Sequence, residues 1–367
     1  MSVLSQPQFH DEAAAFAFVE AELWPNGPIC HHCGGFERIS AITPNPAKRI
    51  RIGLKFCGQC RKQFTVRMGT VFEESKLPMT KWLQAIYLMV SSKKGVSAHQ
   101  LHRTLEVTYK TAWFLAHRIR EAMRCGELAP FGGQGGAVEV DETYLGNNPD
   151  NEPKEGKLRR SANKNCLVTM IDRDTGRARS IVIDRMDAAA IGGILEDNIS
   201  TEARLMTDEH PLYGMLGYAF ADHGRVTHSR GEYVSKQDRT VHTQTVEGFY
   251  SVFKRGMKGV YQHCAKKHLH RYAAEFDFRY SYRIALGVDD TARATRALQG
   301  VVGKRLTEER EESVPFTVVD GIVRRLGRRG RCLVVGFRGV DAGSFGGPRP
   351  TRWRCSKSGR RINGASG

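Results

Sequence analysis

Long apolar runs are absent from this sequence, and so is the pattern of a secretory leader. No apolar stretch approaches the roughly 20 residues that a transmembrane helix needs. The first residues, MSVLSQPQFHDEAAAF, do not combine a basic stretch with an apolar one, as a signal peptide does. We therefore expect a cytoplasmic protein with no membrane partner.

Acidic residues are scarce relative to basic ones. Lysine and arginine number 56, whereas aspartate and glutamate number 39, which gives a formal net charge of +17. Such an excess disfavours compaction, and it usually serves a polyanionic partner. A basic protein kept soluble by its charge is the alternative. We expect nucleic acid as the partner of a chain whose 367 residues suffice for two or three domains.

Nine cysteines would be unusual for a reduced protein unless some bind metal, and four of the nine follow a regular pattern. Two CxxC pairs occur, Cys30–Cys33 (CHHC) and Cys57–Cys60 (CGQC). Each pair can put two thiolates on one tight turn, and tetrahedral zinc needs four soft ligands. The two histidines inside the first pair sit where the chain is too short to turn them to the same metal. A disulfide pair or four unrelated thiols are the alternatives. The spacing predicts a zinc ribbon over residues 14–72, with a structural zinc bound by Cys30, Cys33, Cys57 and Cys60.

Residues 73–130 follow a helical pattern. Ser97 opens a capping box, and a later helix has an apolar stripe with Arg118, Arg120 and Arg124 off that stripe. The helix, turn and basic helix of SAHQLHRTLEVTYKTAWFLAHRIREAM have lengths suited to a helix-turn-helix that contacts DNA. A purely helical spacer is the alternative.

Beyond the glycine-rich joint FGGQGG, the periodicity changes from helical to alternating. The predicted strands cover residues 136–146, 165–172, 177–185 and 203–208. A helix is predicted over 187–199, helices dominate from 243 to 298, and a polar, basic excursion over 147–164 separates the first two strands. A meander of three strands followed by strand and helix alternation predicts a mixed α/β sheet.

Three acids stand out by their position on these elements. Asp141 lies inside the first predicted strand, with Glu139 on the same face and Glu142 on the other. Asp208 ends a short apolar strand, and Glu247 opens a helix with an apolar stripe. Carboxylates that converge from strand ends and a helix can share two Mg²⁺ ions for phosphodiester chemistry. Each acid alone is more commonly a solvated surface residue, so the prediction rests on order and spacing.

The third acid has competitors near the same place in the sequence. Glu232 lies in a loop flanked by Gly and Ser, Gln244 carries no charge, and Glu275 lies among residues where a salt bridge to an arginine explains it. Glu247 is favoured because it lies beside the apolar stripe that must face the sheet. Lys254 follows seven residues later, which puts both side chains on one helix face.

Five stretches of the chain carry a further signal: CHHCGG, KFCGQCRKQFTVRMGTVFEESKLPMTKW, VEVDETYLG, LMTDEHPLY and HTQTVEGFYSVFKRGMKGVYQHCAKKHLHRYAAEFDFRYSYR. Over roughly residues 14–310 the chain resembles the DDE transposases of bacterial insertion sequences, in the subgroup with an N-terminal zinc ribbon. The resemblance implies an RNase H-like catalytic core over residues 136–310, two Mg²⁺ or Mn²⁺ ions, and cutting and joining of DNA at element ends. Carried over position by position, the catalytic residues are Asp141, Asp208, Glu247 and Lys254, and the three acids are the metal ligands.

The resemblance also implies partners and a location. Double-stranded DNA at the element ends and at the target is the expected substrate, with no small-molecule substrate. A homo-oligomer on DNA and a cytoplasmic, nucleoid-associated location in a bacterium are expected. Two alternatives stay open: a DNA-binding regulator derived from an inactive transposase, and a structure-specific nuclease that shares the core without joining DNA.

Three features depart from the pattern of this subgroup. Gln244 stands where many relatives have Asn, and Asn147 and Asn148 replace the Gly and basic residues that often follow YLG. The tail over residues 321–367 is rich in Arg and Gly and is not explained by the resemblance. Because this tail has little core-forming material, we expect it to be disordered.

Overall fold

The computed structural model describes residues 2–124, 126, 129–146, 164–306, 317–319, 322–324 and 334–336. The chain divides into a first unit, Met1–Ser313, and a second unit, Val314–Gly367. In the second unit, three short antiparallel strands form a sheet in the order β11-β10-β9. These strands are β9 (Thr317–Val319), β10 (Ile322–Arg324) and β11 (Val334–Gly336). The rest of the tail, and the excursion predicted over 147–164 except its last residue, lie outside the described residues, so the predicted disorder of the tail stays a prediction.

The predicted ribbon folds as a small antiparallel sheet in the order β1-β2-β3. Its strands are β1 (Ile39–Ala41), β2 (Lys55–Cys57) and β3 (Lys62–Phe64). The alternation of RIRIGLKF indicates a strand from residue 49, but only its end is one. Arg49 has a positive φ of 55° after the short 3-10 helix Pro46–Lys48, and this turn prevents an extended backbone at that point.

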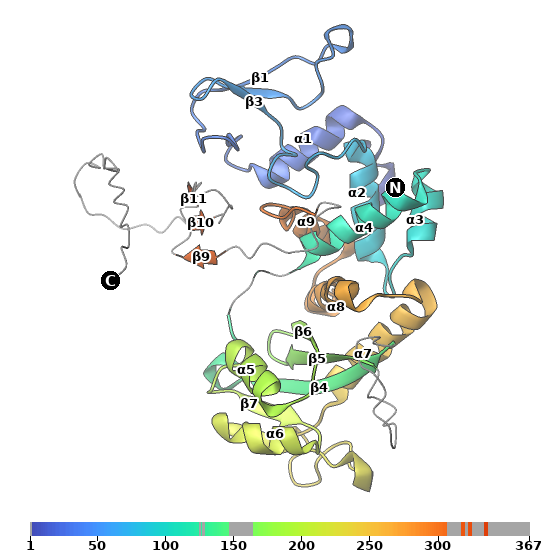
Figure 1. The fold of residues 1–367 in the computed structure, drawn as a ribbon, viewed down its shortest axis with the longest axis vertical. Coiled ribbons are helices and arrows are strands. Elements are labelled where there is room, and N and C mark those ends of the chain that lie inside the picture. Colours follow the sequence, from blue (N-terminus) through green and yellow to red (C-terminus); the bar gives the residue numbers. More distant parts are fainter. Residues whose placement is uncertain are drawn as a thin grey trace, which may run out of the picture. The chain divides into compact units, whose positions relative to one another are not determined.

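Five helices form a separate apolar core in the first unit (Figure 1). They are α1 (Glu12–Leu23), α2 (Met79–Ser91), α3 (Ala98–Leu105), α4 (Tyr109–Met123) and α9 (Asp290–Gln299). The predicted cap is confirmed, since the Ser97 side chain accepts a hydrogen bond from the Gln100 amide at 3.1 Å. Helix α9 falls within the predicted catalytic range but packs on α1, α2 and α4. Among the described helices, none combines the length and apolar character needed to cross a bilayer.

The five-stranded sheet has the mixed architecture that the sequence predicts. Its order is β6-β5-β4-β7-β8. The strands are β4 (Ala137–Leu145), β5 (Asn165–Asp172), β6 (Ala178–Ile183), β7 (Arg204–Thr207) and β8 (Asp222–Arg225). Strands β4, β5 and β6 form an antiparallel meander, whereas β4, β7 and β8 are parallel. A three-stranded meander extended by two parallel strands is the arrangement of an RNase H-like core.

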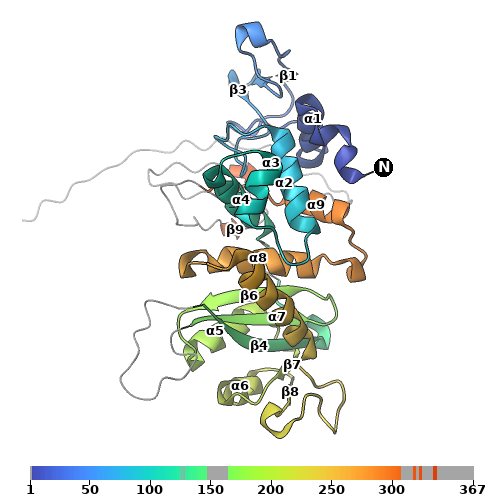
Figure 2. The same ribbon diagram turned by 90° about the vertical axis from the view of Figure 1, so that its right-hand side faces the viewer.

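Helices cover both faces of this sheet, and Figure 2 shows α6 on one side and α8 on the other. These helices are α5 (Ala188–Asn198), α6 (Pro211–Leu216), α7 (Gln244–Gly256) and α8 (Lys266–Ser281). Val138 and Val140 of β4 pack into the core beneath α5 and α6, whereas Leu145 packs beneath α7 and α8. Because side chains alternate along a strand, the odd-numbered residues of β4 face α7 and α8.

A buried ionic cluster joins α4 to the catalytic region. The carboxylate of Glu275 on α8 is fully buried and accepts hydrogen bonds from Arg120 Nε at 2.7 Å, Arg279 Nη1 at 2.7 Å and the Tyr261 hydroxyl at 2.6 Å. Tyr261 ends a π-helical turn, Met257–Tyr261, that continues α7. Burial alone would raise the pKa of Glu275, but Arg279 and Arg120 hold it below its ordinary value. The salt bridge expected for Glu275 is therefore confirmed.

The arginines of α4 serve the fold rather than an exposed basic face. Arg118 is buried and donates to the backbone carbonyls of Val71, Glu73 and Leu306. Arg118 and Arg120 lie off the apolar stripe and are nevertheless buried. Carbonyls and a carboxylate from distant parts of the chain bury these guanidinium groups, and helical periodicity does not reveal such partners.

Replacing Glu275 with Ala should lower the free energy of unfolding by about 3–5 kcal/mol, because it leaves buried guanidinium groups without their anion. Urea denaturation of the purified chain measures this change. The exposed Glu196 of α5 provides a matched helical control, and Glu196→Ala should change stability by less than about 0.5 kcal/mol. Equal effects of the two substitutions would contradict a stabilising role for the cluster.

Candidate functional site

The four cysteines of the two CxxC pairs meet at one point. Their sulfur atoms all lie within 4.8 Å of one another. The Sγ atoms of Cys30 and Cys60 are 3.7 Å apart, as are those of Cys33 and Cys57. A zinc ion with four sulfur ligands at roughly 2.3 Å separates the sulfurs by about 3.8 Å in a regular tetrahedron. The four thiols therefore fit a structural zinc ion.

Two tight turns bring these cysteines together. The Gly34 amide donates to the Cys30 carbonyl at 2.8 Å, and Gly34 has a positive φ of 73° that glycine adopts without strain. On the other side, the Arg61 amide donates to the Cys57 carbonyl at 2.8 Å. The His32 Nε2 atom lies 3.1 Å from the Gln63 carbonyl oxygen, so this ring is engaged with the backbone instead of the sulfurs.

The predicted acids occupy neighbouring strands and the helix above them. Asp141 lies on β4, and Asp208 directly follows β7, the parallel neighbour of β4. Glu139 pairs with Met206 in this ladder, and the same register continued by two residues sets Asp141 level with Asp208. Glu247 lies in the first turn of α7. The fold thus brings together three acids that are far apart in the sequence.

The charges of these acids act on one another. Burial, together with the negative charges of Glu142, Asp208 and Glu247, raises the pKa of Asp141 to about 8. Burial and the charge of Asp208 likewise raise the pKa of Glu142. Among the described residues, the four cysteines form the group whose ligand atoms all lie within 4.8 Å of one another. The carboxylate oxygens of the three acids do not form such a group, so they lie further apart than the cysteine sulfurs. Such a group of carboxylates is suited to cations, which relieve the repulsion.

Local hydrogen bonds orient the acids. The Asp208 carboxylate accepts from the His210 amide at 2.9 Å, in a turn that follows β7. The Tyr213 hydroxyl donates to Glu142 at 3.0 Å from the other face of the sheet. The His228 ring lies 3.6 Å from the Glu247 carboxylate. Sequence reasoning did not find Tyr213 or His228, because no periodicity links them to the acids.

One side of α7 faces the acids. The Tyr250 hydroxyl donates to the backbone carbonyl of Asp141 at 2.6 Å. The Lys254 ammonium lies 5.6 Å from the centre of the Tyr250 ring, one turn further along. Glu247, Tyr250 and Lys254 therefore follow one another along the same side of the helix, in agreement with the seven-residue spacing.

The competing residues for the third acid lie elsewhere or lack the charge. Glu232 is in a loop and accepts a hydrogen bond from the Lys236 amide at 3.1 Å. Gln244 is exposed at the first position of α7. Glu275 belongs to the buried cluster with Arg120. Of these residues, Glu247 is the one whose charge raises the pKa of Asp141.

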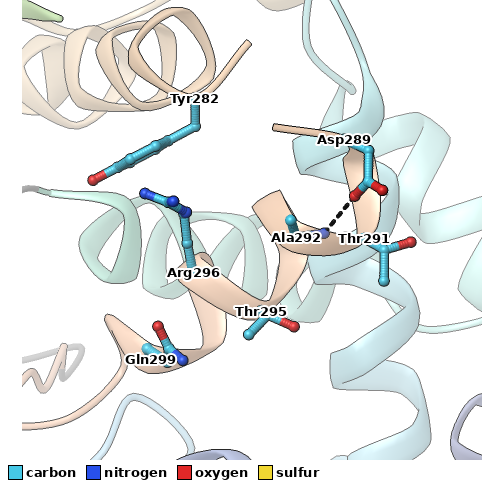
Figure 3. Close-up of a pocket in the computed structure, with 7 residues that line it drawn as sticks. All are labelled: Tyr282, Asp289, Thr291, Ala292, Thr295, Arg296 and Gln299. Atoms are coloured by element: carbon cyan, nitrogen blue, oxygen red, sulfur yellow. Dashed lines mark hydrogen bonds between the residues drawn. The ribbon is translucent and has the colours of Figure 1, made fainter. Parts of the chain in front are cut away.

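A hollow of about 630 Å³ lies away from the acids, along α9 (Figure 3). Tyr282 and Arg296 line it, with the guanidinium 4.5 Å from the centre of the ring. Asp289 at its rim caps α9 by accepting from the Ala292 amide at 2.7 Å. None of the predicted catalytic acids lines this hollow, so the acids remain the candidate catalytic site.

Two family models match the chain, and together they span more than half of it. Residues 134–281 match the ISXO2-like transposase domain, and residues 10–63 match a transposase zinc-ribbon domain. A relative named "Uncharacterized protein in transposable element ISH50", from Halobacterium salinarum, is 26% identical over 268 residues, which cover 70% of this chain and 86% of the relative.

A solved structure of a simian T-cell lymphotropic virus intasome, in complex with PP2A regulatory subunit B56 gamma, is 14% identical. The match covers 48% of this chain and 67% of that one, with a TM-score of 0.24, and carries no weight for function.

The strand order defines an RNase H-like core behind a four-cysteine ribbon, and the transposase family model identifies a protein of the DNA-processing class. Within that class, the chain belongs to the ISXO2-like DDE transposases, the insertion-sequence family with an N-terminal zinc ribbon. The predicted fold and family are therefore confirmed.

The wild-type chain should contain one zinc ion, and Cys57→Ser should lose it. Structural zinc contributes on the order of 10 kcal/mol to small modules, so loss of one thiolate should unfold the ribbon. Elemental analysis of the purified proteins measures the metal. Cys264→Ser, which changes a cysteine outside the ribbon, is the control and should keep full zinc. Full occupancy in Cys57→Ser would rule out this ligand set.

Proposed function

We propose that this protein is a DNA transposase that cuts at insertion-element ends and joins them to target DNA by phosphodiester hydrolysis and transesterification. The observation that carries the proposal is the position of Asp141 on β4 beside Asp208, which directly follows the parallel neighbour β7, with Glu247 close enough to raise the pKa of Asp141. Membership of the transposase family agrees with it.

The acids would hold two Mg²⁺ or Mn²⁺ ions. Asp141, Asp208 and Glu247 offer the hard oxygen ligands that these ions prefer, and their mutual repulsion favours a cation between them. Bound in such a pair, the ions supply activation of the attacking hydroxyl and stabilisation of the leaving oxygen. The protein's own part is to fix the carboxylates on β4, after β7 and on α7.

Lys254 would bind DNA phosphate beside the acids. Seven residues separate it from Glu247, which places its ammonium about 10 Å further along the helix axis. The Tyr250 ring beneath it limits the directions that the lysine side chain can take. The lysine therefore holds the DNA backbone in place while the carboxylates act on the scissile bond, and Lys254→Ala should weaken end binding or strand transfer.

The helix-turn-helix would contact DNA through the beginning of α4. Three residues, Glu106–Thr108, join α3 to α4, and Glu106 takes a left-handed backbone at φ 53° that permits the tight turn. In such motifs the N-terminal residues of the second helix reach the base edges. Tyr109 and Lys110 are exposed there, whereas the later arginines Arg118 and Arg120 are buried.

The partners and location follow from this chemistry. Joining two ends in one reaction calls for more than one copy of the chain on the DNA, so we propose a homo-oligomer. The zinc ribbon would add a basic DNA-contacting module to each copy. Action on chromosomal DNA places the protein in the cytoplasm at the nucleoid.

Glu247→Gln is nearly isosteric and should leave folding and DNA binding intact, while metal-dependent cleavage falls by several orders of magnitude. Cleavage of labelled element-end duplex in Mg²⁺ measures the effect. Asp141→Asn and Asp208→Asn should behave alike, and Glu232→Gln should cleave as the wild type does. If cleavage survives Glu247→Gln but disappears in a folded Glu275→Gln protein, the assignment of the third acid to α7 is wrong.

Binding to duplex DNA should weaken steeply with added salt. Each phosphate neutralised by the protein contributes roughly −0.9 to the slope of log K against log salt concentration. Since several phosphates should be contacted by so basic a chain, the slope should be several times that value. Fluorescence anisotropy between roughly 50 and 200 mM salt measures it. A slope near zero would exclude DNA as the polyanionic partner.

A further inference from the structure

A third carboxylate of β4, Glu139, is fully buried two residues before Asp141. Both of its oxygens are engaged. Oε2 accepts from the amides of Thr245 and Val246, each at 2.9 Å. Oε1 accepts from the Thr245 hydroxyl at 2.6 Å and from Arg173 Nε at 2.6 Å. These four hydrogen bonds leave little capacity for a metal ion, so Glu139 differs in kind from Asp141.

The amides that Glu139 binds belong to the first turn of α7. The first amides of a helix have no partner inside the helix, and a residue preceding the helix commonly caps them. Here the side chain of Thr243 at the cap position makes no such hydrogen bond. Glu139 supplies the cap from a separate strand, and its negative charge also suits the positive end of the helix dipole.

Arg173 extends this contact to the segment that leads into α7. It follows β5, and its Nη atoms donate to the carbonyls of Thr240 at 2.5 Å and His242 at 2.7 Å. Its Nε atom lies 2.6 Å from Glu139 Oε1, so Arg173 is the cation that balances the charge of Glu139. Glu139 and Arg173 together therefore fix the first turn of α7 and the segment directly before it.

Two points of attachment join α7 to β4. Glu139 holds Thr245 and Val246, the residues directly before Glu247. The Tyr250 hydroxyl holds the backbone of Asp141 at 2.6 Å. Two attachments roughly one turn apart set both the axial position of the helix and its rotation about its axis. Together they determine where the Glu247 carboxylate lies relative to Asp141.

We propose that Glu139 is a positioning residue for the metal-dependent reaction: by capping α7 from β4, it holds Glu247 at the distance and orientation at which it completes the ligand set with Asp141 and Asp208. This inference rests on the proposed function, since it concerns the same site. It assigns separate roles to the three acids of β4, because Glu139 positions the helix, Asp141 binds metal, and Glu142 lies on the opposite face beside Tyr213.

Glu139→Gln tests this role. An amide can accept hydrogen bonds through one oxygen only, and its NH₂ group would face N–H or O–H donors, so the first turn of α7 should shift. Mutation of a group that orients a metal ligand typically lowers metal affinity or activity by about 10- to 100-fold. We expect the Mg²⁺ concentration for half-maximal cleavage to rise by at least about tenfold, with DNA end binding retained. Metal titration of cleavage and of Mn²⁺ binding without DNA provides two readouts.

Thr245→Val provides a milder second variant, in case the charge change prevents folding. It removes only the hydroxyl that donates to Glu139 at 2.6 Å, and it should shift the metal dependence in the same direction by a smaller factor.

Asp277→Asn is the matched control for lost stability. Asp277 is a carboxylate on α8 that accepts from the amide and hydroxyl of Ser180 at 2.8 and 2.6 Å, so these hydrogen bonds attach α8 to β6 and not to α7. It should lower the melting temperature without changing the Mg²⁺ dependence of the remaining folded protein.

The outcomes separate this inference from the proposed function. If the wild type does not cleave end DNA in Mg²⁺, the proposed function fails. If the wild type cleaves and Glu139→Gln and Thr245→Val keep its Mg²⁺ and Mn²⁺ dependence, the positioning role is wrong while the function stands. If Asp277→Asn raises the Mg²⁺ concentration for half-maximal cleavage as much as Glu139→Gln does, the positioning role is also wrong, since general destabilisation would then explain both effects.

Discussion

The attachment of α7 to β4 is the constraint on which the catalytic site depends. Asp141 and Asp208 come close without a side-chain contact between them, because the parallel pairing of β4 with β7 extends to Glu139 and Met206, two residues before each acid. Glu247 lies on a helix more than 100 residues after β4, and no backbone ladder fixes it. Side-chain contacts hold it in place: apolar side chains of α7 pack on the sheet, and the Glu139 cap and the Tyr250 hydrogen bond attach the helix to β4.

Acidic and basic side chains are distributed differently in this molecule. Acids gather on the sheet, where burial and mutual repulsion prepare a place for cations. Part of the positive charge is not available to DNA, because five of the 56 basic side chains are arginines buried against carbonyls and carboxylates. The buried arginines are Arg118, Arg120, Arg271, Arg279 and Arg293. The net charge of the sequence therefore overstates the basic surface, and the proposed DNA contacts involve the half-buried Lys254 and the exposed start of α4.

Local patterns in the sequence predicted the elements of the catalytic core well. Alternation located β5 over the residues that the structure assigns to it, and β4, β6 and β7 to within two residues at either end. Spacing alone predicted the cysteine cluster, because a CxxC turn is a local device. A salt bridge was also the right interpretation for Glu275, although its partner Arg120 lies on a helix 155 residues away.

What the sequence could not show depends on contacts between distant segments. The same alternation was misleading in RIRIGLKF, where the left-handed backbone of Arg49 breaks the strand. The burial of Arg118 and Arg120 could not be predicted, because their partners come from other parts of the chain. Glu139 was placed on the face of Asp141, but its role appears only when the amides of α7, about 106 residues later, are seen to bind it.

The most direct test of the central claim is a strand-transfer assay with the purified wild-type chain, Mg²⁺, duplex carrying the ends of its own element, and a target plasmid. The proposed mechanism predicts cleaved ends that become covalently joined to the plasmid, and neither product when Mg²⁺ is chelated. Cleavage without joining would indicate a nuclease that shares the core. DNA binding with neither reaction would indicate a regulator, and either result would contradict a transposase mechanism.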